Sequence, residues 1–211
     1  ANLRQLKDIS FARFDEQLFS DQPDPKRHQS DLSPRAQIRG IRQACERFVA
    51  EFDEPETRNL FFVGKPGTGK TFLMACIAHA IIESGRTALY LPAAQLFDAL
   101  AEYRVLSTTF HPDEIRFEKS AAMQDAILHC NLLLIDDLGT EPLWEGITVE
   151  QLFALIEHRL NNRLHTVIST NLSLTEVKGR YTERLMSRLS DEQMWKKLAF
   201  LGEDLRLKRN T

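Results

Sequence analysis

Residues 64–71 read GKPGTGKT and match the pattern G-x-x-x-x-G-K-[ST] at every fixed position. The segment consists of Gly64, Lys65, Pro66, Gly67, Thr68, Gly69, Lys70 and Thr71. Its glycines let backbone N–H groups turn inward around a polyphosphate, which side chains would block. In this pattern the lysine contacts the β- and γ-phosphates, and the final hydroxyl binds Mg²⁺. The segment therefore predicts a site for a nucleoside triphosphate and Mg²⁺.

Two aspartates follow an apolar run about 65 residues further along the chain. Residues 132–135 are all apolar, and Asp136 and Asp137 come directly after them. Taken alone, such a pair is more often a helix cap or a turn. At this distance from a phosphate loop, Asp136 is predicted to bind Mg²⁺ and Asp137 to orient or deprotonate the attacking water.

Asn171 follows a third apolar run and can position the attacking water against the γ-phosphate. The Asn-Lys-x-Asp tetrapeptide that usually reads guanine does not occur in the sequence, which argues against a GTPase. A nucleotide kinase would carry an arginine-rich lid over its acceptor, whereas the arginines of this chain cluster late, as at Arg184, Arg188 and Arg206. These motifs alone leave several classes of phosphate-loop protein open.

The hydrophobic pattern predicts the elements that must hold these residues. Short apolar runs alternate with longer helical stretches, which is typical of βαβ units and of a parallel sheet covered on both faces. The predicted strands are 60–63, 88–91, 132–135, 166–169 and, more weakly, 198–201. The predicted helices are 35–52, 70–84, 94–104, 113–129 and 148–162. The fold class is therefore α/β, with a parallel five-stranded sheet.

Composition and charge exclude other classes of protein. The 211 residues include 27 Lys and Arg against 30 Asp and Glu, a formal net charge of −3. This balance excludes nucleic-acid binding by bulk positive charge, although a local basic patch remains compatible with it. No apolar run approaches the roughly 18 residues of a membrane span, and we expect a cytoplasmic protein. Cys45, Cys76 and Cys130 lack any Cys-x-x-Cys pairing, which predicts buried thiols in a reducing compartment.

The motifs GKPGTGKT, LLLIDDLGTE, STN, ERLMSRL and GEDLR occur in this order within residues 36–209. Together they resemble the AAA+ ATPase domain of bacterial replicative helicase loaders of the DnaC/DnaI type. Transposase helper ATPases of the IstB type share most of this pattern. The resemblance implies a three-layer αβα P-loop domain that binds ATP and ADP with Mg²⁺. It also implies that Asp136 and Asp137 form the Walker B pair and that Asn171 is sensor 1.

The same resemblance implies roles for three arginines. Arg184 and Arg188 match the box VII arginines, and Arg188 is similar to the finger that completes the ATP site of a neighbouring subunit. Arg206, in GEDLR, is similar to the sensor 2 arginine that contacts the γ-phosphate. Without the resemblance, the favoured interpretation is that Arg184 and Arg188 are two surface arginines, four residues apart on a short helix. The short stretch after Arg206 leaves little or no room for a C-terminal helical lid.

The resemblance implies an ATP-driven switch that loads the replicative hexameric helicase onto single-stranded DNA and self-associates through its ATP site. Loaders also carry an amino-terminal helicase-binding domain. Residues 1–34 combine apolar residues such as Phe14 and Phe19 with a polar stretch that contains two prolines, so we expect an arm or linker that docks on a neighbouring surface. The resemblance implies that residues 35–211 are the ATPase domain of a longer protein. Three alternatives stay open: a transposase helper acting on duplex DNA, a slow ATP-dependent scaffold suggested by Asp137 in place of glutamate, and a small-molecule kinase.

The stretch 94–130 between the second and third predicted strands is longer than a crossover requires. Related initiator and loader ATPases place a helical insertion here that lines a channel for single-stranded DNA. Basic and aromatic side chains alternate in it, and stacking combined with phosphate contacts suits sequence-independent binding. We predict contact with single-stranded DNA through Tyr103, Arg104, Arg116 and Lys119. Core packing of the aromatic residues, with nearby carboxylates diluting the charge, is an equally weighted interpretation.

Overall fold

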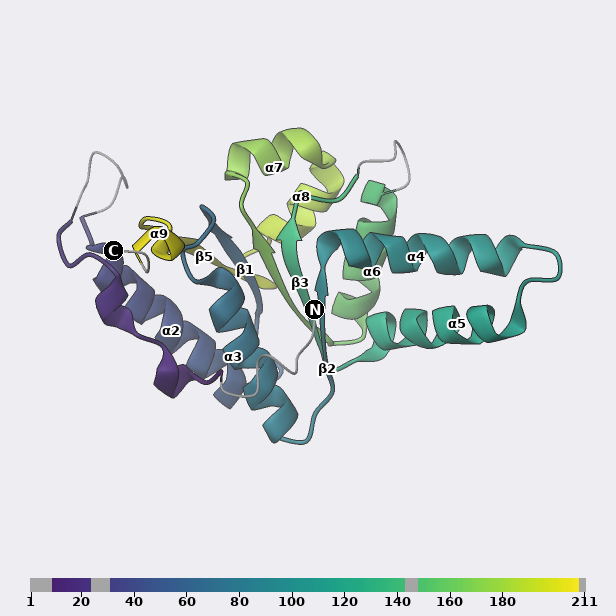
Figure 1. The fold of residues 1–211 in the computed structure, drawn as a ribbon, viewed down its shortest axis with the longest axis horizontal. Coiled ribbons are helices and arrows are strands. Elements are labelled where there is room, and N and C mark those ends of the chain that lie inside the picture. The colour runs from purple at the N-terminus through teal and green to yellow at the C-terminus, as the bar shows by residue number, and fades with distance from the viewer. Residues whose placement is uncertain (1–8, 24–30, 143–147, 209–211) are drawn as a thin grey trace.

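The computed structural model describes residues 9–23, 31–142 and 148–208. The remaining parts of the predicted arm (1–8 and 24–30) and of the predicted ATPase domain (143–147 and 209–211) lie outside the described residues. A five-stranded sheet forms the centre of the molecule, and helices cover both of its faces (Figure 1). The predicted α/β class is confirmed.

The sheet is parallel throughout. Its strands are β1 (Asn59–Gly64), β2 (Ala88–Pro92), β3 (Leu132–Leu138), β4 (His165–Thr170) and β5 (Trp195–Phe200). Their order is β2-β3-β4-β1-β5, and every neighbouring pair is parallel. All five predicted strands are present, although β5 begins three residues before its predicted start of 198. Because β3, β4 and β1 are neighbours, their carboxyl ends meet at one edge of the sheet.

The five predicted helices are also present. They are α2 (Pro34–Ala50), α3 (Lys70–Glu83), α4 (Ala93–Thr108), α5 (Glu114–His129) and α6 (Thr148–Asn161). Five shorter elements were not predicted: the 3₁₀ turns η2 (Phe11–Arg13) and η3 (Glu16–Leu18), and the helices α7 (Leu174–Arg180), α8 (Glu183–Ser190) and α9 (Leu205–Lys208). Segments of this length are too short to show a helical period. After β5 the described chain adds the single turn α9.

Alternating strand residues build two separate cores. Phe61, Leu133 and Ile168 face the core formed with α4, α5, α6 and the α7–α8 segment. Their neighbours along the strands, such as Phe62, Leu134 and Val167, point to the other face of the sheet and pack against α2, α3 and the arm. Burial on both faces explains the continuous apolar runs 60–63 of β1 and 132–135 of β3, whereas the edge strand β5 carries the exposed Lys197. The arrangement confirms the three-layer αβα prediction.

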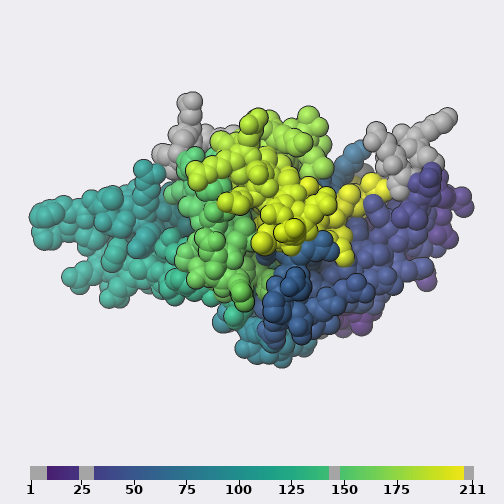
Figure 2. Space-filling view, turned by 180° about the vertical axis from the view of Figure 1, so that it is seen from behind, coloured from purple at the N-terminus to yellow at the C-terminus, as the bar shows by residue number. Residues whose placement is uncertain are grey.

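Helices α4 and α5 form a hairpin that extends away from the sheet (Figures 1 and 2). Its two arms contact each other through the stacked rings of Tyr103 and Phe117, whose centroids are 6.3 Å apart. Arg116 also pairs with Glu102 across the hairpin, with Nε 2.7 Å from the carboxylate. Phe110, between the two helices, is 90% exposed. The hairpin is therefore held together by its own contacts and presents an apolar residue at its far end.

Arg159 is a fully buried arginine that forms hydrogen bonds with the segment leading into β3 and with the start of β4. The guanidinium of Arg159, from α6, donates to four backbone carbonyls and one hydroxyl. These acceptors belong to Ile127, Leu128, Cys130, His165 and Thr166. Burial lowers the pKa of Arg159, and the ring of carbonyl oxygens supplies hydrogen bonds in place of the lost water.

The predicted buried thiols are confirmed, since Cys45, Cys76 and Cys130 are all free and buried. None of the helices in the described ranges combines the length and the apolar character that crossing a bilayer requires.

Candidate functional site

The phosphate-loop segment connects the carboxyl end of β1 to the first turn of α3. Gly67 and Gly69 adopt φ angles of 73° and 96°, in the left-handed region that favours glycine. Gly69 is also the N-cap of α3, a helix of 14 residues. The positive end of the helix dipole therefore lies at the loop, where it favours an anionic group.

Lys70 is the central polar residue of this loop. Its side chain is buried, and Nζ donates to the carbonyls of Gly64 at 2.7 Å and Lys65 at 2.8 Å. A third bond of 2.7 Å runs to Oδ1 of Asn171, at the end of β4. Burial lowers the pKa of Lys70, while the nearby Asp137 and Asp136 act against this shift. The ammonium group is thus held in place before any phosphate binds.

Asp136 accepts hydrogen bonds on both carboxylate oxygens. Thr71 donates its hydroxyl to Oδ2 at 2.9 Å, and the Tyr90 hydroxyl, from β2, donates to the same oxygen. Ser169, from β4, donates its hydroxyl to Oδ1. Hydroxyl and carboxylate oxygens are ligands that Mg²⁺ prefers, so Thr71 and Asp136 fit the predicted metal position. Tyr90 and Ser169 were not predicted as site residues: Tyr90 lies outside the motifs, and in the STN motif only Asn171 was assigned a role.

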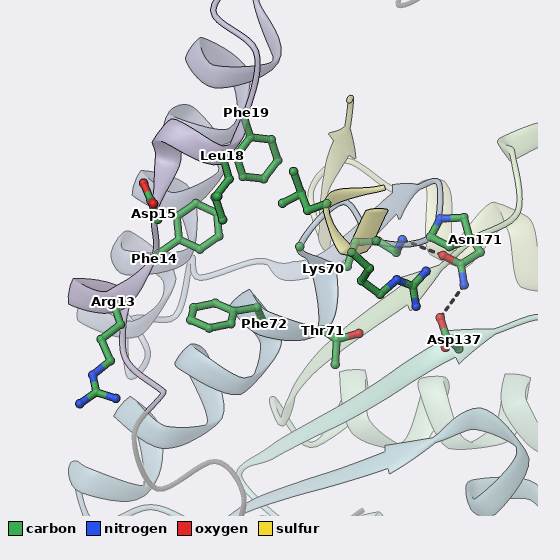
Figure 3. Close-up of a pocket in the computed structure, with 15 residues that line it drawn as sticks. Arg13, Phe14, Asp15, Leu18, Phe19, Lys70, Thr71, Phe72, Asp137 and Asn171 are labelled. Atoms are coloured by element: carbon green, nitrogen blue, oxygen red, sulfur yellow. Dashed lines mark hydrogen bonds between the residues drawn. The ribbon is translucent and has the colours of Figure 1, made fainter. Parts of the chain in front are cut away.

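Asp137 has a φ of 55°, a left-handed conformation that is uncommon for a residue other than glycine. Asn171 donates through Nδ2 to Oδ1 of Asp137 at 2.7 Å, so its amide connects Lys70 to this carboxylate (Figure 3). Burial, and then the charge of Asp136, raise the pKa of Asp137, while Lys70 and Asn171 act to lower it. A carboxylate with a raised pKa is a better proton acceptor, as a general base requires.

A cavity of about 560 Å³ opens in front of these groups, within the size range of small-molecule sites. One wall is polar and consists of the phosphate loop with Asp137 and Asn171. The opposite wall is apolar and comes largely from the arm, with Phe14 and Phe19 beside Phe72 of α3 (Figure 3). The ring centroids of Phe14 lie 5.9 Å from Phe19 and 5.7 Å from Phe72. The predicted arm thus packs on the phosphate-loop region of its own chain.

Arg206 also lines this cavity, at the start of α9. Its guanidinium binds the carboxylate of Asp204, with Nη2 to Oδ2 at 2.7 Å. Asp204 in turn lies so close to Gly67 that a Cβ on this glycine would be 1.8 Å from Oδ1. The N–H of Leu205 donates to the Gly67 carbonyl at 3.0 Å. The structure therefore brings the predicted sensor 2 arginine to the phosphate loop.

Arg184 and Arg188 lie elsewhere, on the exposed side of α8. Neither is among the described residues that line the cavity. The guanidinium of Arg184 lies over the ring of Phe153, 4.0 Å from its centroid. Arg188 pairs with Glu157 of α6, with Nε 2.6 Å from Oε1. Within one chain, the two predicted box VII arginines are thus separated from the nucleotide cavity.

The four predicted DNA contacts all lie on the hairpin. Tyr103 and Arg116 are engaged within it, by Phe117 and Glu102 respectively. Arg104 and Lys119 are exposed. The hairpin also carries the carboxylates of Asp98, Glu102, Asp113, Glu114, Glu118 and Asp125. Its surface is therefore mixed in charge, without a continuous basic stripe.

Comparison with known proteins agrees with this geometry. Residues 48–209 match the family described as IstB-like ATP binding protein. The replicative helicase loader DnaC of Escherichia coli (strain K12) is 27% identical over 151 residues, 69% of this chain and 55% of that protein. The replicative helicase loader DnaI of Bacillus subtilis (strain 168) is 24% identical over 163 residues, 73% of this chain and 46% of that protein. A crystal structure of the DnaC helicase loader has a TM-score of 0.67 at 22% identity and covers 94% of this chain and 99% of that chain.

The chain thus spans about half the length of the curated relatives it matches. The structural likeness identifies the fold as the AAA+ αβα fold of those loaders. The family match extends from α2 through the phosphate loop to α9, and so includes the residues that form the polar wall of the cavity. The chain belongs to the family of IstB-like ATP binding proteins.

Proposed function

We propose that this chain is the ATPase domain of a cytoplasmic switch that loads a replicative helicase onto single-stranded DNA. Two relatives that carry the name of replicative helicase loader support the proposal, at 27% and 24% identity. One observation carries it furthest: one chain holds nearly all the predicted ATP-site residues together, while Arg184 and Arg188 face outward on α8. Such a division suits a site that a neighbouring subunit completes.

In this proposal the residues of one chain divide the phosphate chemistry between them. The phosphate loop and Lys70 bind the β- and γ-phosphates, and Arg206 contacts the γ-phosphate after leaving Asp204. Thr71 and Asp136 hold Mg²⁺, which when bound polarises the phosphoryl oxygens. Asp137 accepts the proton of the attacking water, and Asn171 orients that water against the γ-phosphate.

The apolar wall of the cavity supports adenosine binding at the other end of the nucleotide. Phe14, Phe19 and Phe72 offer ring faces within reach of one another, and an aromatic base packs favourably against such surfaces. Because Phe14 and Phe19 belong to the arm, base binding depends on the arm staying in place. The arm is therefore part of the proposed ATP site.

Arg188 of one subunit is proposed to act on the ATP of the next. A guanidinium placed at the γ-phosphate stabilises the charge of the transition state, an effect worth about 10³–10⁵ in rate in other phosphoryl-transfer enzymes. To do so, Arg188 must exchange its contact with Glu157 for the phosphate. Because Arg188 is partly exposed, breaking its ion pair costs little free energy: surface ion pairs contribute about 0–1 kcal/mol to stability.

The hairpin is proposed to contact single-stranded DNA through Tyr103, Arg104, Arg116 and Lys119. The exposure of Arg104 and Lys119 supports this part of the proposal. The ion pair of Arg116 with Glu102 and the stacking of Tyr103 on Phe117 oppose it, since both contacts would have to open. The binding expected is weak and sensitive to salt.

The test is ATP turnover per chain as a function of protein concentration, with and without single-stranded DNA. We expect turnover to rise with concentration, because each site needs a neighbour, and to change when DNA is added. Turnover that is independent of both would contradict the proposal and favour a kinase with a small acceptor. ATP binding without turnover under all conditions would favour the slow scaffold.

A transposase helper is the second candidate, and the match to the IstB-like family favours it. It would use the same ATP chemistry on duplex DNA with a different protein partner. The two candidates separate when turnover is compared with equal lengths of single-stranded and duplex DNA. Stronger stimulation by the duplex would favour the transposase helper.

A further inference from the structure

Glu141 is a buried carboxylate that the ATP chemistry above does not use. Its side chain is 0% exposed and is not among the described residues that line the nucleotide cavity. It accepts hydrogen bonds from the N–H of Gly139 at 2.8 Å and from the hydroxyl of Tyr181. Arg180 donates to its backbone carbonyl, and Nε of Arg180 lies 3.4 Å from Oε1. We call Glu141, Arg180 and Tyr181 the Glu141 cluster.

The Glu141 cluster joins two segments that the proposed function assigns to different ATP sites. On one side is the turn after Asp137, in which Thr140 donates its N–H at 3.2 Å and its hydroxyl at 2.8 Å to the Asp137 carbonyl. On the other side, Arg180 ends α7 and Tyr181 directly precedes Thr182, the N-cap of α8. The cluster therefore lies between the proposed general base and the start of the helix that carries Arg184 and Arg188.

The hydrogen bonds of the Glu141 cluster can fix the orientation of α8 relative to the turn after Asp137, as well as the distance between them. A buried carboxylate loses its hydration, which only well-placed donors replace. Tyr181 is buried, and burial together with the bond to Glu141 raises the pKa of its hydroxyl, so this group remains a donor at neutral pH. Donors from three residues converge on Glu141, and charge-assisted bonds of this kind are directional. An apolar contact would fill the same space without fixing an orientation.

The position of Arg188 depends strongly on the direction in which α8 starts. Arg188 lies in the last turn of this eight-residue helix, roughly 9 Å along the axis from the N-cap at 1.5 Å per residue. A tilt of about 10° at the cluster would therefore move Arg188 by about 1.6 Å, given that distance. Displacements of about 1 Å in catalytic groups can cost about 10²-fold in rate.

We propose that Glu141 is a positioning residue that orients α8, so that the arginines of one subunit reach the ATP site of the next. The proposal rests on the proposed function, because it requires a site shared between subunits. Glu141 acts through α8 and does not touch the nucleotide. Replacing Glu141 should therefore lower turnover when the change is in the subunit that donates Arg188, and not when it is in the subunit that binds ATP.

A mixing experiment separates these two roles. Lys70→Ala chains cannot turn over ATP but keep Arg188, so they serve as donors. Arg188→Ala chains keep an intact phosphate loop but offer no finger, so they serve as acceptors. Neither turns over ATP alone, and the mixture should recover turnover at interfaces where an acceptor site meets a donor arginine. Glu141→Gln is then added to the donor or to the acceptor.

We expect Glu141→Gln in the donor to lower the turnover of the mixture by about 10–100-fold, and the same change in the acceptor to alter it by less than about twofold. Equal losses from both positions, or no loss from the donor, would overturn the proposal. A mixture of the unmodified donor and acceptor that stays inactive would instead show that the proposed shared site is wrong.

Two further variants guard against a trivial loss of folding. Tyr181→Phe removes one donor to Glu141 and keeps the ring, and it should reproduce the donor-specific loss in a weaker form. Glu150→Gln changes an exposed carboxylate on α6 and should leave the mixture unchanged in either position. Melting temperatures of all chains, measured before mixing, identify any variant that is unfolded.

Discussion

Lys70 and Arg188, two of the cations that the proposal assigns to ATP turnover, lie in opposite environments. Lys70 is 4% exposed and makes three hydrogen bonds that fix its ammonium group at the phosphate loop. The side chain of Arg188 is 50% exposed and has one carboxylate partner, Glu157, on the surface. A single chain thus preorganises the part of the site that binds phosphate. The part proposed to act in the transition state is presented outward, where a neighbour can receive it.

Replacing the buried cation should have the largest effect. Lys70→Ala removes the charge and leaves the carbonyls of Gly64 and Lys65 without their donor. We expect ATP turnover and binding to fall below detection, by more than about 10³-fold in rate. Fluorescent-nucleotide titration and phosphate release measure both quantities. Lys197→Ala, at an exposed position of β5, is the control, and turnover within tenfold of wild type for Lys70→Ala would contradict the phosphate-loop assignment.

Replacing the exposed cation should separate binding from turnover. Arg188→Ala should lower turnover by about 10³-fold, while the ATP affinity of the isolated chain stays within about twofold. Arg184→Ala should cost less, about tenfold, because the Arg184 guanidinium is engaged by the ring of Phe153. Wild-type turnover in Arg188→Ala at high protein concentration would remove this residue from the shared site.

Asp137→Asn should lower turnover by about 10²-fold and at the same time stabilise the fold. The pKa of Asp137 is raised by burial and by Asp136, so folding disfavours its ionised form. That penalty is present at pH 7 and disappears as the pH falls below the ordinary aspartate pKa of about 3.9. We therefore expect a higher melting temperature for the variant at pH 7 and a smaller difference near pH 4.

The same carboxylate determines how wild-type turnover responds to acid. Because the general base must be ionised, turnover should fall as the pH decreases through the raised pKa of Asp137, earlier than an ordinary aspartate would allow. Asp98→Asn, at an exposed position of α4, is a control for both measurements. A variant that is less stable than wild type at pH 7 would contradict the role assigned to burial.

The smallest effect expected is on the base end of the site. Phe14→Ala removes one aromatic wall and should weaken ATP binding about tenfold, or about 1.4 kcal/mol, slightly less than the roughly 1.5–3 kcal/mol of burying a whole apolar side chain. Competition by inorganic triphosphate, which lacks a base, should be unchanged. Phe110→Ala, at the exposed hairpin tip, is the matched control. Equal weakening of triphosphate and ATP binding would show that the arm supports the loop and not the base.

Local patterns predicted the sheet and the polar wall of the cavity well. The phosphate loop and the strand ends at Asp136 and Asn171 are short motifs next to apolar strands, and parallel strand order brings them together. Tyr90, Ser169 and Glu141 were not predicted in the same way, because no sequence pattern assigns a role to these side chains and their contacts appear only in the folded chain. Helix α7 was not predicted because seven residues carry too little periodicity, and the segment of α8 was considered only as a short helix that carries Arg184 and Arg188.

The arm illustrates the same limit. Residues 1–34 were predicted to dock on a neighbouring surface, but the sequence did not indicate which surface Phe14 and Phe19 would cover. In the folded chain the two rings lie against the phosphate loop, 3.6 Å (Phe19) and 3.7 Å (Phe14) from the position that a Cβ on Gly69 would take, which is ordinary van der Waals distance. Tertiary contacts of this kind decide which surface an amphipathic segment covers.

Arg159 has a consequence for the order in which the molecule assembles. Its five acceptors come from the end of α5, from the α5 C-cap Cys130 just before β3, and from the start of β4, so its hydrogen bonds form together once these segments are adjacent. Before that, the guanidinium stays hydrated and resists burial. Pairing of β3 with β4 and burial of α6 should therefore be one cooperative event. In native-state hydrogen exchange, the amides of α6 and of β4 should open as a single unit.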